Sequence, residues 1–135
     1  MKQEQMKVLL SIKPEFAERI FEGSKKYEFR KALFKNSDIK TIVVYASSPT
    51  QRVIGEFEIE TIISDSPEKL WNETKEFAGV EEHFFYEYFA DREMGFAIKI
   101  KKTKKYKEVL CLREHFNLTP PQSFLYLRNE NLVSQ

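Results

Sequence analysis

The sequence has little of what metal centres and disulfide scaffolds require. Its 135 residues include one cysteine, Cys111, and two histidines, so an internal disulfide is excluded and the usual Cys/His set for structural zinc is missing. Glycine and proline are also scarce, with four and five residues, which argues against a low-complexity chain. We therefore expect a chain that folds around its own core, without a metal or another cofactor.

The sequence also lacks an excess of either charge and any long apolar run. Twenty-two Lys and Arg balance twenty-one Asp and Glu, so attraction to nucleic acid has to come from a local patch. No segment approaches the roughly 20 apolar residues of a membrane-spanning helix, and the apolar run before Lys13 is too short for a signal-peptide core. We expect a soluble cytoplasmic protein with no membrane partner.

Apolar residues are present in sufficient number for a core. They make up 41% of the sequence, and aromatic residues make up 14%. In a chain of this length that is enough to bury a stable core. We find no repeat and no linker, and therefore predict one domain over residues 1–135.

Hydrophobic periodicity predicts a mixed succession of strands and helices. Strands are expected over 6–13, 26–33, 42–46, 53–60 and 95–107, and helices over 14–22, 66–78, 80–90 and 112–116. The continuous apolar run 42–46 is typical of a strand covered on both faces. Connections between consecutive strands are short, which favours a mixed, mostly antiparallel α+β fold, most simply a small β-barrel flanked by helices.

Several residues mark where these elements end or bend. Pro14 in a first helical turn and Gly23 as a C-terminal cap delimit the first helix, and Ser66 is placed as the N-cap of the second. In the long strand, Gly55 and a phase slip at Ile62-Ile63 predict bulges that curve the sheet. The second helix is expected to turn Phe77 inward with its other apolar residues.

The sequence contains none of the familiar catalytic motifs, and one charged stretch remains as a candidate site. There is no phosphate-binding loop, no dinucleotide fingerprint, no G-x-S-x-G and no H-E-x-x-H. What remains is G-x-K-x-x-E-x-R, formed by Gly23, Lys25, Glu28 and Arg30. Glu28 and Arg30 share one side of a strand, which suits either a solvated ion pair or a site.

The same stretch resembles a known family. LSIKPEFAERIFEGSKKYEFRK, then VVYASSPTQRVIGEFEIE and PPQSFLYL, are similar to the ASCH domain of the PUA-like superfamily, whose hallmark is this spacing. The resemblance implies a PUA-like β-barrel and a cleft lined by Lys25, Glu28 and Arg30 that binds RNA, a nucleotide or a modified nucleoside. Chemically, Arg30 offers a bidentate fork to phosphate, Lys25 a point charge, and Glu28 an acceptor for an amino group.

Members of this family that are hydrolases provide the alternative. One branch hydrolyses acetylated cytidine nucleosides and another cleaves RNA. The lysine of the first branch corresponds to Lys25, but its threonine is replaced here by Glu28, and Ser24, which adjoins Lys25, is the candidate for a substitute hydroxyl. If the chain is an enzyme, Glu28 is expected to be the base that activates water, and Lys25 to stabilise the developing oxyanion.

Further candidates are assigned by residue type and position. Tyr45 and Trp71 offer faces for base stacking, although both also suit the core. Ser47 and Ser48 follow a buried strand, where they either bond a ligand or make a turn, and Gln122 either reads a base edge or bonds the backbone. A basic run either contacts RNA phosphates or protects an edge strand; its candidate residues are Lys99, Lys101, Lys102, Lys104 and Lys105.

Overall fold

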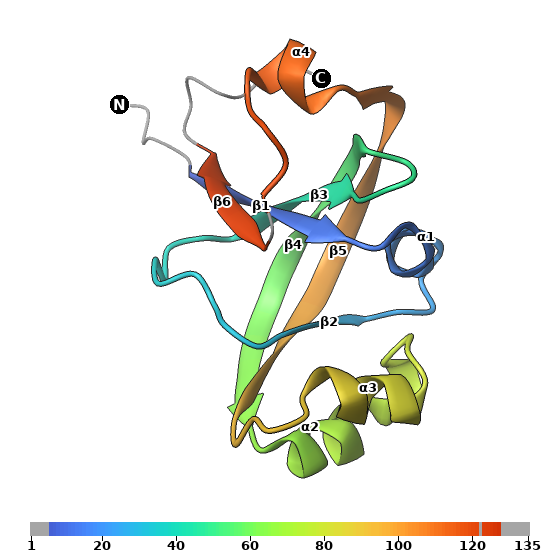
Figure 1. The fold of residues 1–135 in the computed structure, drawn as a ribbon, viewed down its shortest axis with the longest axis vertical. Helices are drawn as coiled ribbons and strands as arrows, with labels where there is room; N and C mark the ends of the chain where they lie inside the picture. Colours follow the sequence, from blue (N-terminus) through green and yellow to red (C-terminus); the bar gives the residue numbers. More distant parts are fainter. Residues whose placement is uncertain (1–5, 122, 128–135) are drawn as a thin grey trace.

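The structure is a computed structural model that describes residues 6–121 and 123–127, which form a mixed succession of strands and helices (Figure 1). The strands are β1 (Lys7–Ile12), β2 (Tyr27–Arg30), β3 (Thr41–Ala46), β4 (Arg52–Asp65), β5 (Gly95–Leu110) and β6 (Phe124–Leu127). The helices are α1 (Pro14–Glu22), α2 (Pro67–Thr74), the 3₁₀ helix η1 (Lys75–Phe77), α3 (Glu82–Tyr88) and α4 (Leu112–Phe116). None of the helices in the described ranges has the length and apolar character that crossing a bilayer requires.

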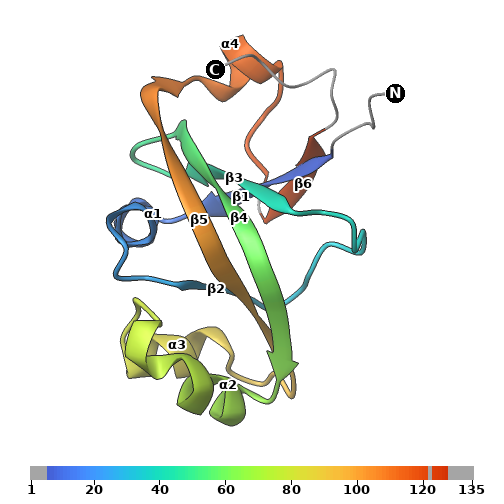
Figure 2. The same ribbon diagram turned by 180° about the vertical axis from the view of Figure 1, so that it is seen from behind.

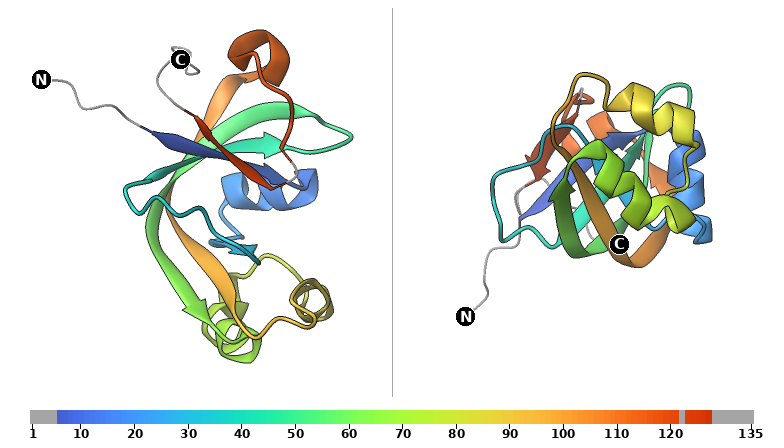
Figure 3. Two further views of the ribbon diagram at one scale, coloured as in Figure 1. Left: turned by 60° about the vertical axis from the view of Figure 1, so that its left-hand side comes forward. Right: turned by 90° about the horizontal axis from the view of Figure 1, so that it is seen from below.

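The strands form one curled sheet in the order β2-β5-β4-β3-β1-β6. β1 and β3 run parallel, and the other neighbouring pairs are antiparallel. β4 and β5 make a long ribbon that crosses the molecule from end to end, as both faces show (Figures 1 and 2). Figure 3 shows this ribbon bowed, with α1 and β2 on its concave side. The predicted mostly antiparallel, barrel-like α+β architecture is confirmed.

The ladder between β4 and β5 is irregular at three places in the described residues. The register shifts between Val53 and Gly55, between Glu58 and Ile59, and between Ile59 and Thr61. The first shift confirms the prediction, and glycine is required there because an added Cβ would lie 2.6 Å from the Phe21 ring. The other two shifts lie earlier than Ile62-Ile63, where the phase slip placed a bulge, because β4 keeps one register from Thr61 to its end.

The helix ends follow the local sequence, with one exception. Pro14 lies in the first turn of α1, and Gly23 ends it in the left-handed conformation, with φ of 100°. The Ser66 side chain caps α2 as predicted. The predicted continuation of α2 through residue 78 is wrong, because the α-helix ends at Thr74 and tightens into η1. Phe77 is consequently 39% exposed instead of inward.

The buried side chains form three clusters, and the third one positions the site. β3 separates the first two, because Ile42 and Val44 face one cluster and Val43 and Tyr45 face the other. This confirms a strand covered on both faces. The third cluster surrounds Phe29 of β2 and packs α2 and α3 against β2 and β5. It thereby holds α3 beside the strand that carries Glu28 and Arg30.

Candidate functional site

Lys25 is buried at the end of the turn that follows α1. The left-handed Gly23 lets the Lys25 amide donate to Arg19 O at 3.0 Å, and this turn takes the lysine out of the alternation of β2. The Lys25 side chain is 1% exposed, and its Nζ donates to Ala78 O at 2.8 Å. A buried ammonium group requires such partners, because desolvating it alone is costly. The turn therefore directs Lys25 into the interior.

Gly79 provides the space that the Lys25 side chain occupies. Its φ is +69°, and an added Cβ would overlap the Cβ and Cγ of Lys25. Its carbonyl accepts a hydrogen bond from Arg19 Nη1 at 2.8 Å, while the Phe77 carbonyl accepts one from the Lys26 amide at 2.9 Å. Phe77 and Gly79 are thus hydrogen-bonded to Lys26 and Arg19, which lie on either side of Lys25 in the sequence.

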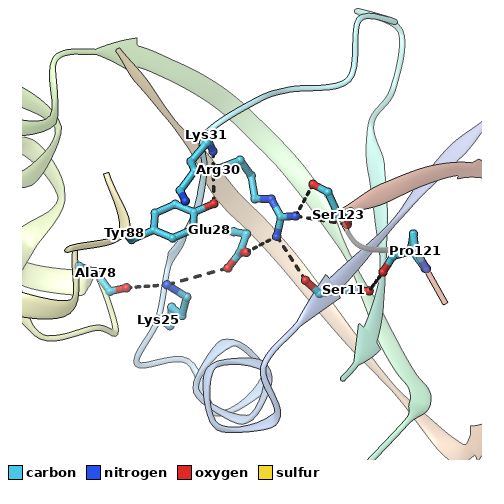
Figure 4. Close-up of polar contacts among 9 residues, drawn as sticks. All are labelled: Ser11, Lys25, Glu28, Arg30, Lys31, Ala78, Tyr88, Pro121 and Ser123. Atoms are coloured by element: carbon cyan, nitrogen blue, oxygen red, sulfur yellow. Dashed lines mark hydrogen bonds and ion pairs between the residues drawn. The ribbon is translucent and has the colours of Figure 1, made fainter. Parts of the chain in front are cut away.

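Glu28 and Arg30 project from the same side of β2, as strand alternation predicts, and form an ion pair (Figure 4). Arg30 Nη1 donates to Glu28 Oε2 at 3.1 Å and to Ser11 O at 3.3 Å. Arg30 Nη2 donates to Ser123 O at 3.2 Å and to Ser123 Oγ at 2.8 Å. The Arg30 guanidinium group, which we expected to bind phosphate, is therefore already hydrogen-bonded to protein groups. Arg30 ties β2 to β1 and to the residue that precedes β6.

Glu28 connects the two cations and keeps one oxygen available. Its Oε1 lies 4.0 Å from Lys25 Nζ, which is too long for a hydrogen bond. Within residues 6–121 and 123–127, Oε1 accepts no hydrogen bond. Because a carboxylate offers about four acceptor sites, Glu28 retains the capacity to accept a hydrogen bond from a ligand.

These charged groups line a pocket of about 410 Å³. Its walls include the aromatic side chains of Phe16, Phe84 and Tyr88. The lining residues are Ser11, Ile12, Lys13, Phe16, Lys25, Glu28, Phe29, Arg30, Lys31, Ala32, Val80, Phe84, Tyr88 and Ser123. The volume is in the range of small-molecule sites, which combine apolar walls with a few placed polar groups.

Burial sets the protonation of two pocket residues. Desolvation lowers the pKa of Lys25 from 10.5 to about 8, although the nearby Glu28 carboxylate opposes the shift. Burial raises the pKa of Tyr88 above 10.0, and its hydroxyl accepts a hydrogen bond from the Lys31 amide at 3.2 Å. Below pH 8, therefore, Lys25 holds its proton and contributes a positive charge to the floor of the pocket.

Four other candidates lie away from this pocket. Tyr45 is 4% exposed and belongs to the second core cluster. It is therefore a core residue, which was the alternative to base stacking. Ser47 and Ser48 lie in the turn after β3, where the Ser47 amide donates to Ile12 O at 2.9 Å. Trp71 packs against Phe85 with ring centres 5.0 Å apart and lines a separate, open hollow between α2 and α3. The structure thus brings together only part of the predicted set.

Two further candidates are Gln122, which carries an amide, and Ser24, which carries a hydroxyl. Gln122 lies outside the described residues. The exposed Ser24 donates its hydroxyl to Glu22 Oε1 at 2.7 Å, on the outside of the turn. Because Ser24 is not among the residues that line the pocket, the structure does not support it as a substitute for the missing threonine.

The basic run lies along β5, beside an acidic strand. Lys99 forms an ion pair with Glu60 at 3.0 Å, and Lys102 and Lys104 are paired across the ladder with Glu58 and Glu56. Lys101 and Lys105 are exposed on the same strand. Carboxylates of β4 therefore offset part of the positive charge expected to meet RNA phosphates. β2 pairs with β5 over residues 96–99. Most of the basic run therefore lies beyond the part of β5 that pairs with β2.

Sequence reasoning missed four residues that build the pocket. Ser11, Gly79 and Ser123 hold the charged groups in place, and Tyr88 forms a wall. The sequence puts Gly79 between the predicted helices 66–78 and 80–90 and Tyr88 inside the latter, and neither position marks a site. Hydroxyls as common as those of Ser11 and Ser123 carry no local signal, because their roles depend on contacts across the sheet.

The curled six-stranded sheet, with its buried Lys–Glu–Arg array beside flanking helices, defines a PUA-like α+β fold. The chain belongs to the ASCH domain family, whose model matches residues 10–110. An ASCH domain-containing ribonuclease of Zymomonas mobilis is 30% identical over 125 residues, covering 90% of this chain and 84% of that protein. The crystal structure of ASCH from Zymomonas mobilis superimposes with a TM-score of 0.85 at 29% identity, covering 93% of this chain and 90% of that one.

A further relative contains a related segment within a much longer protein. The ATP synthase subunit alpha of Ureaplasma parvum is 30% identical over 127 residues, which is 93% of this chain but 16% of that protein. The likeness is therefore confined to one segment of that subunit.

Proposed function

We propose that this chain, as a single domain, binds RNA and takes one nucleotide into the pocket between β2, α1 and α3. The observation that carries the proposal is the buried array of Lys25, Glu28 and Arg30 at the base of that pocket. Burying three ionisable groups costs free energy of folding. A role in binding a ligand explains why the fold keeps them there. The ribonuclease relative supports RNA as the ligand.

Each of the three charged residues has a distinct part. Glu28 accepts a hydrogen bond from an amino or imino group of the base through its open Oε1. Lys25 supplies positive charge beside it and orients Glu28. Arg30 is a positioning residue, since its terminal N–H groups already bind the protein. Phe84 and Tyr88 provide apolar faces beside the base.

Binding of labelled, mixed-sequence RNA, followed by fluorescence anisotropy, tests the proposal. Glu28→Gln keeps the shape of the side chain but replaces one acceptor oxygen with a donor, and we expect at least tenfold weaker binding, the loss that removing a hydrogen bond to a charged group produces. Glu18→Gln on the exposed side of α1 makes the same charge change outside the pocket and is the matched control. Equal affinity of Glu28→Gln and wild type would refute the site.

RNA cleavage is the second candidate, and one observation favours it. Lys25, whose pKa is about 8, lies 4.0 Å from a carboxylate with a free oxygen. Glu28 then acts as the base that removes a proton from an attacking water molecule, whose oxygen bonds to phosphorus as the bond from phosphorus to the departing ribose oxygen breaks. Glu28 returns the proton to that departing oxygen, and protonated Lys25 stabilises the charge that develops on the phosphoryl oxygens. Cleavage by this route declines as the pH rises through about 8, because Lys25 loses its proton.

Product analysis separates binding from the two kinds of hydrolysis. The protein is incubated with mixed RNA and, separately, with acetylated cytidine, and products are followed on gels and by mass spectrometry. Cleaved RNA that is lost in Glu28→Gln and retained in Glu18→Gln indicates a ribonuclease. Deacetylated cytidine with the same dependence indicates an amidohydrolase. Binding without turnover indicates a recognition module.

A further inference from the structure

The mouth of the pocket carries two cations that the buried array does not use. Lys13 lies between β1 and α1, Lys31 follows β2, and both are exposed and line the pocket. Lys13 Nζ lies 5.0 Å from the centre of the Phe84 ring. Lys31 Nζ lies 4.8 Å from the centre of the Tyr88 ring. Each lysine therefore rests against one aromatic side chain of α3.

The two aromatic partners of these cations lie on one face of α3. Phe84 and Tyr88 are four residues apart in α3, so they share a face of the helix and are separated by about 6 Å along its axis. This rise is of the same order as the separation of neighbouring phosphates along a nucleic-acid strand. Lys13 and Lys31 thus lie against two different residues of the same helix face, and both line the pocket.

The cations at the base of the pocket are buried and already hold protein acceptors. Arg30 directs its terminal N–H groups at Ser11, Glu28 and Ser123, and Lys25, which is buried, donates to a backbone carbonyl. Contacts between exposed lysines and aromatic rings are weak, so the ammonium groups are free to move from the rings to an anion. The uncovered ring faces then become available for stacking with bases.

We propose that Lys13 and Lys31 bind the two phosphates on either side of the nucleotide that enters the pocket. This inference rests on the proposed RNA-binding function, and it specifies the class of ligand that the pocket takes. The ligand is a nucleotide within a strand, with phosphate on both its 5′ and 3′ sides, and a free nucleoside lacks both of these contacts.

The test measures how RNA affinity depends on salt in lysine variants. In wild type, the logarithm of the association constant for mixed-sequence RNA falls linearly with the logarithm of the salt concentration. Lys13→Met and Lys31→Met should each reduce this slope by about 0.7, the value for one phosphate contact on a single strand. Lys13→Arg and Lys31→Arg keep the charge and should restore the slope. Nucleoside 3′,5′-bisphosphates should compete better than 5′-monophosphates, and these better than nucleosides.

Lys26→Met is the matched control. Lys26 Nζ also rests on an aromatic ring, 4.3 Å from the centre of Phe77, but neither residue lines the pocket, so its slope should equal that of wild type. If Lys13→Met and Lys31→Met keep the wild-type slope while Glu28→Gln still weakens binding, the phosphate assignment is wrong and the proposed function stands. If wild type binds no RNA, both are refuted.

Discussion

Replacing Lys25 with methionine should remove a specific pH dependence from the stability of the fold. Lys25 has a pKa of about 8 in the folded chain and the ordinary value of 10.5 when unfolded. Below pH 8 both states hold the proton, and the folded state bears the cost of burying the charge. Between pH 8 and 10.5 the folded state releases the proton first, so the free energy of unfolding rises with pH. Methionine has a similar length and carries no proton to release.

The magnitude follows from the difference between the two pKa values. At 1.36 kcal/mol for each pH unit, the full effect is about 3 kcal/mol, of which about 2.5 kcal/mol appears between pH 7 and pH 10. Wild type should therefore gain about 2.5 kcal/mol relative to Lys25→Met over this interval. The comparison uses the change with pH, so it does not depend on the cost of losing the hydrogen bond to Ala78.

Urea unfolding at several pH values measures this difference. The single tryptophan, Trp71, packs against Phe85 and provides the fluorescence signal. Lys69→Met removes an exposed lysine from α2 and serves as the matched control, with the same pH dependence as wild type. If the difference between wild type and Lys25→Met stays constant from pH 7 to pH 10, Lys25 is not a desolvated cation and the account of the pocket floor is wrong.

Two further substitutions test how the array is held. Gly79→Ala should destabilise the fold more than Gly23→Ala. Both glycines have positive φ, but only at Gly79 does an added Cβ meet Lys25. Gly23→Ala should lower the free energy of unfolding by about 1 kcal/mol, and Gly79→Ala should lower it by at least twice that. Equal losses in urea unfolding would mean that Gly79 is needed only for its backbone conformation. Ser123→Ala removes one of the acceptors of Arg30 at an exposed position and should cost about 0.5–1.5 kcal/mol while weakening RNA binding. Ser37→Ala, in the exposed loop before β3, is its control, and unchanged stability and binding in Ser123→Ala would show that Arg30 is held without this hydroxyl.

The local pattern of the chain was sufficient to predict most of the elements. Alternation placed Glu28 and Arg30 on one side of β2, and glycine chemistry placed the turn at Gly23, because both depend on the nearest few residues. The end of α2 was predicted less well. Its apolar spacing continues to Phe77, but the 3₁₀ turn follows from how the segment bonds to Lys26, which is distant in sequence.

The assignment of individual site residues depended on contacts between distant segments. Tyr45 and Trp71 have the right chemistry for stacking, yet their side chains pack in or against the core and away from the charged pocket. Strand periodicity indicates that a side chain faces inward, but it does not indicate which of several clusters receives it.

The sequence by itself determined the family, the mostly antiparallel α+β class and the presence of a Lys–Glu–Arg motif after a glycine turn. Only the tertiary structure decided how these charges are used. Arg30 meets Ser11 and Ser123, which are 19 and 93 residues away in the sequence, so its fork closes the curled sheet. Such pairings depend on the register and curvature of the whole sheet, and no local pattern of residues specifies them.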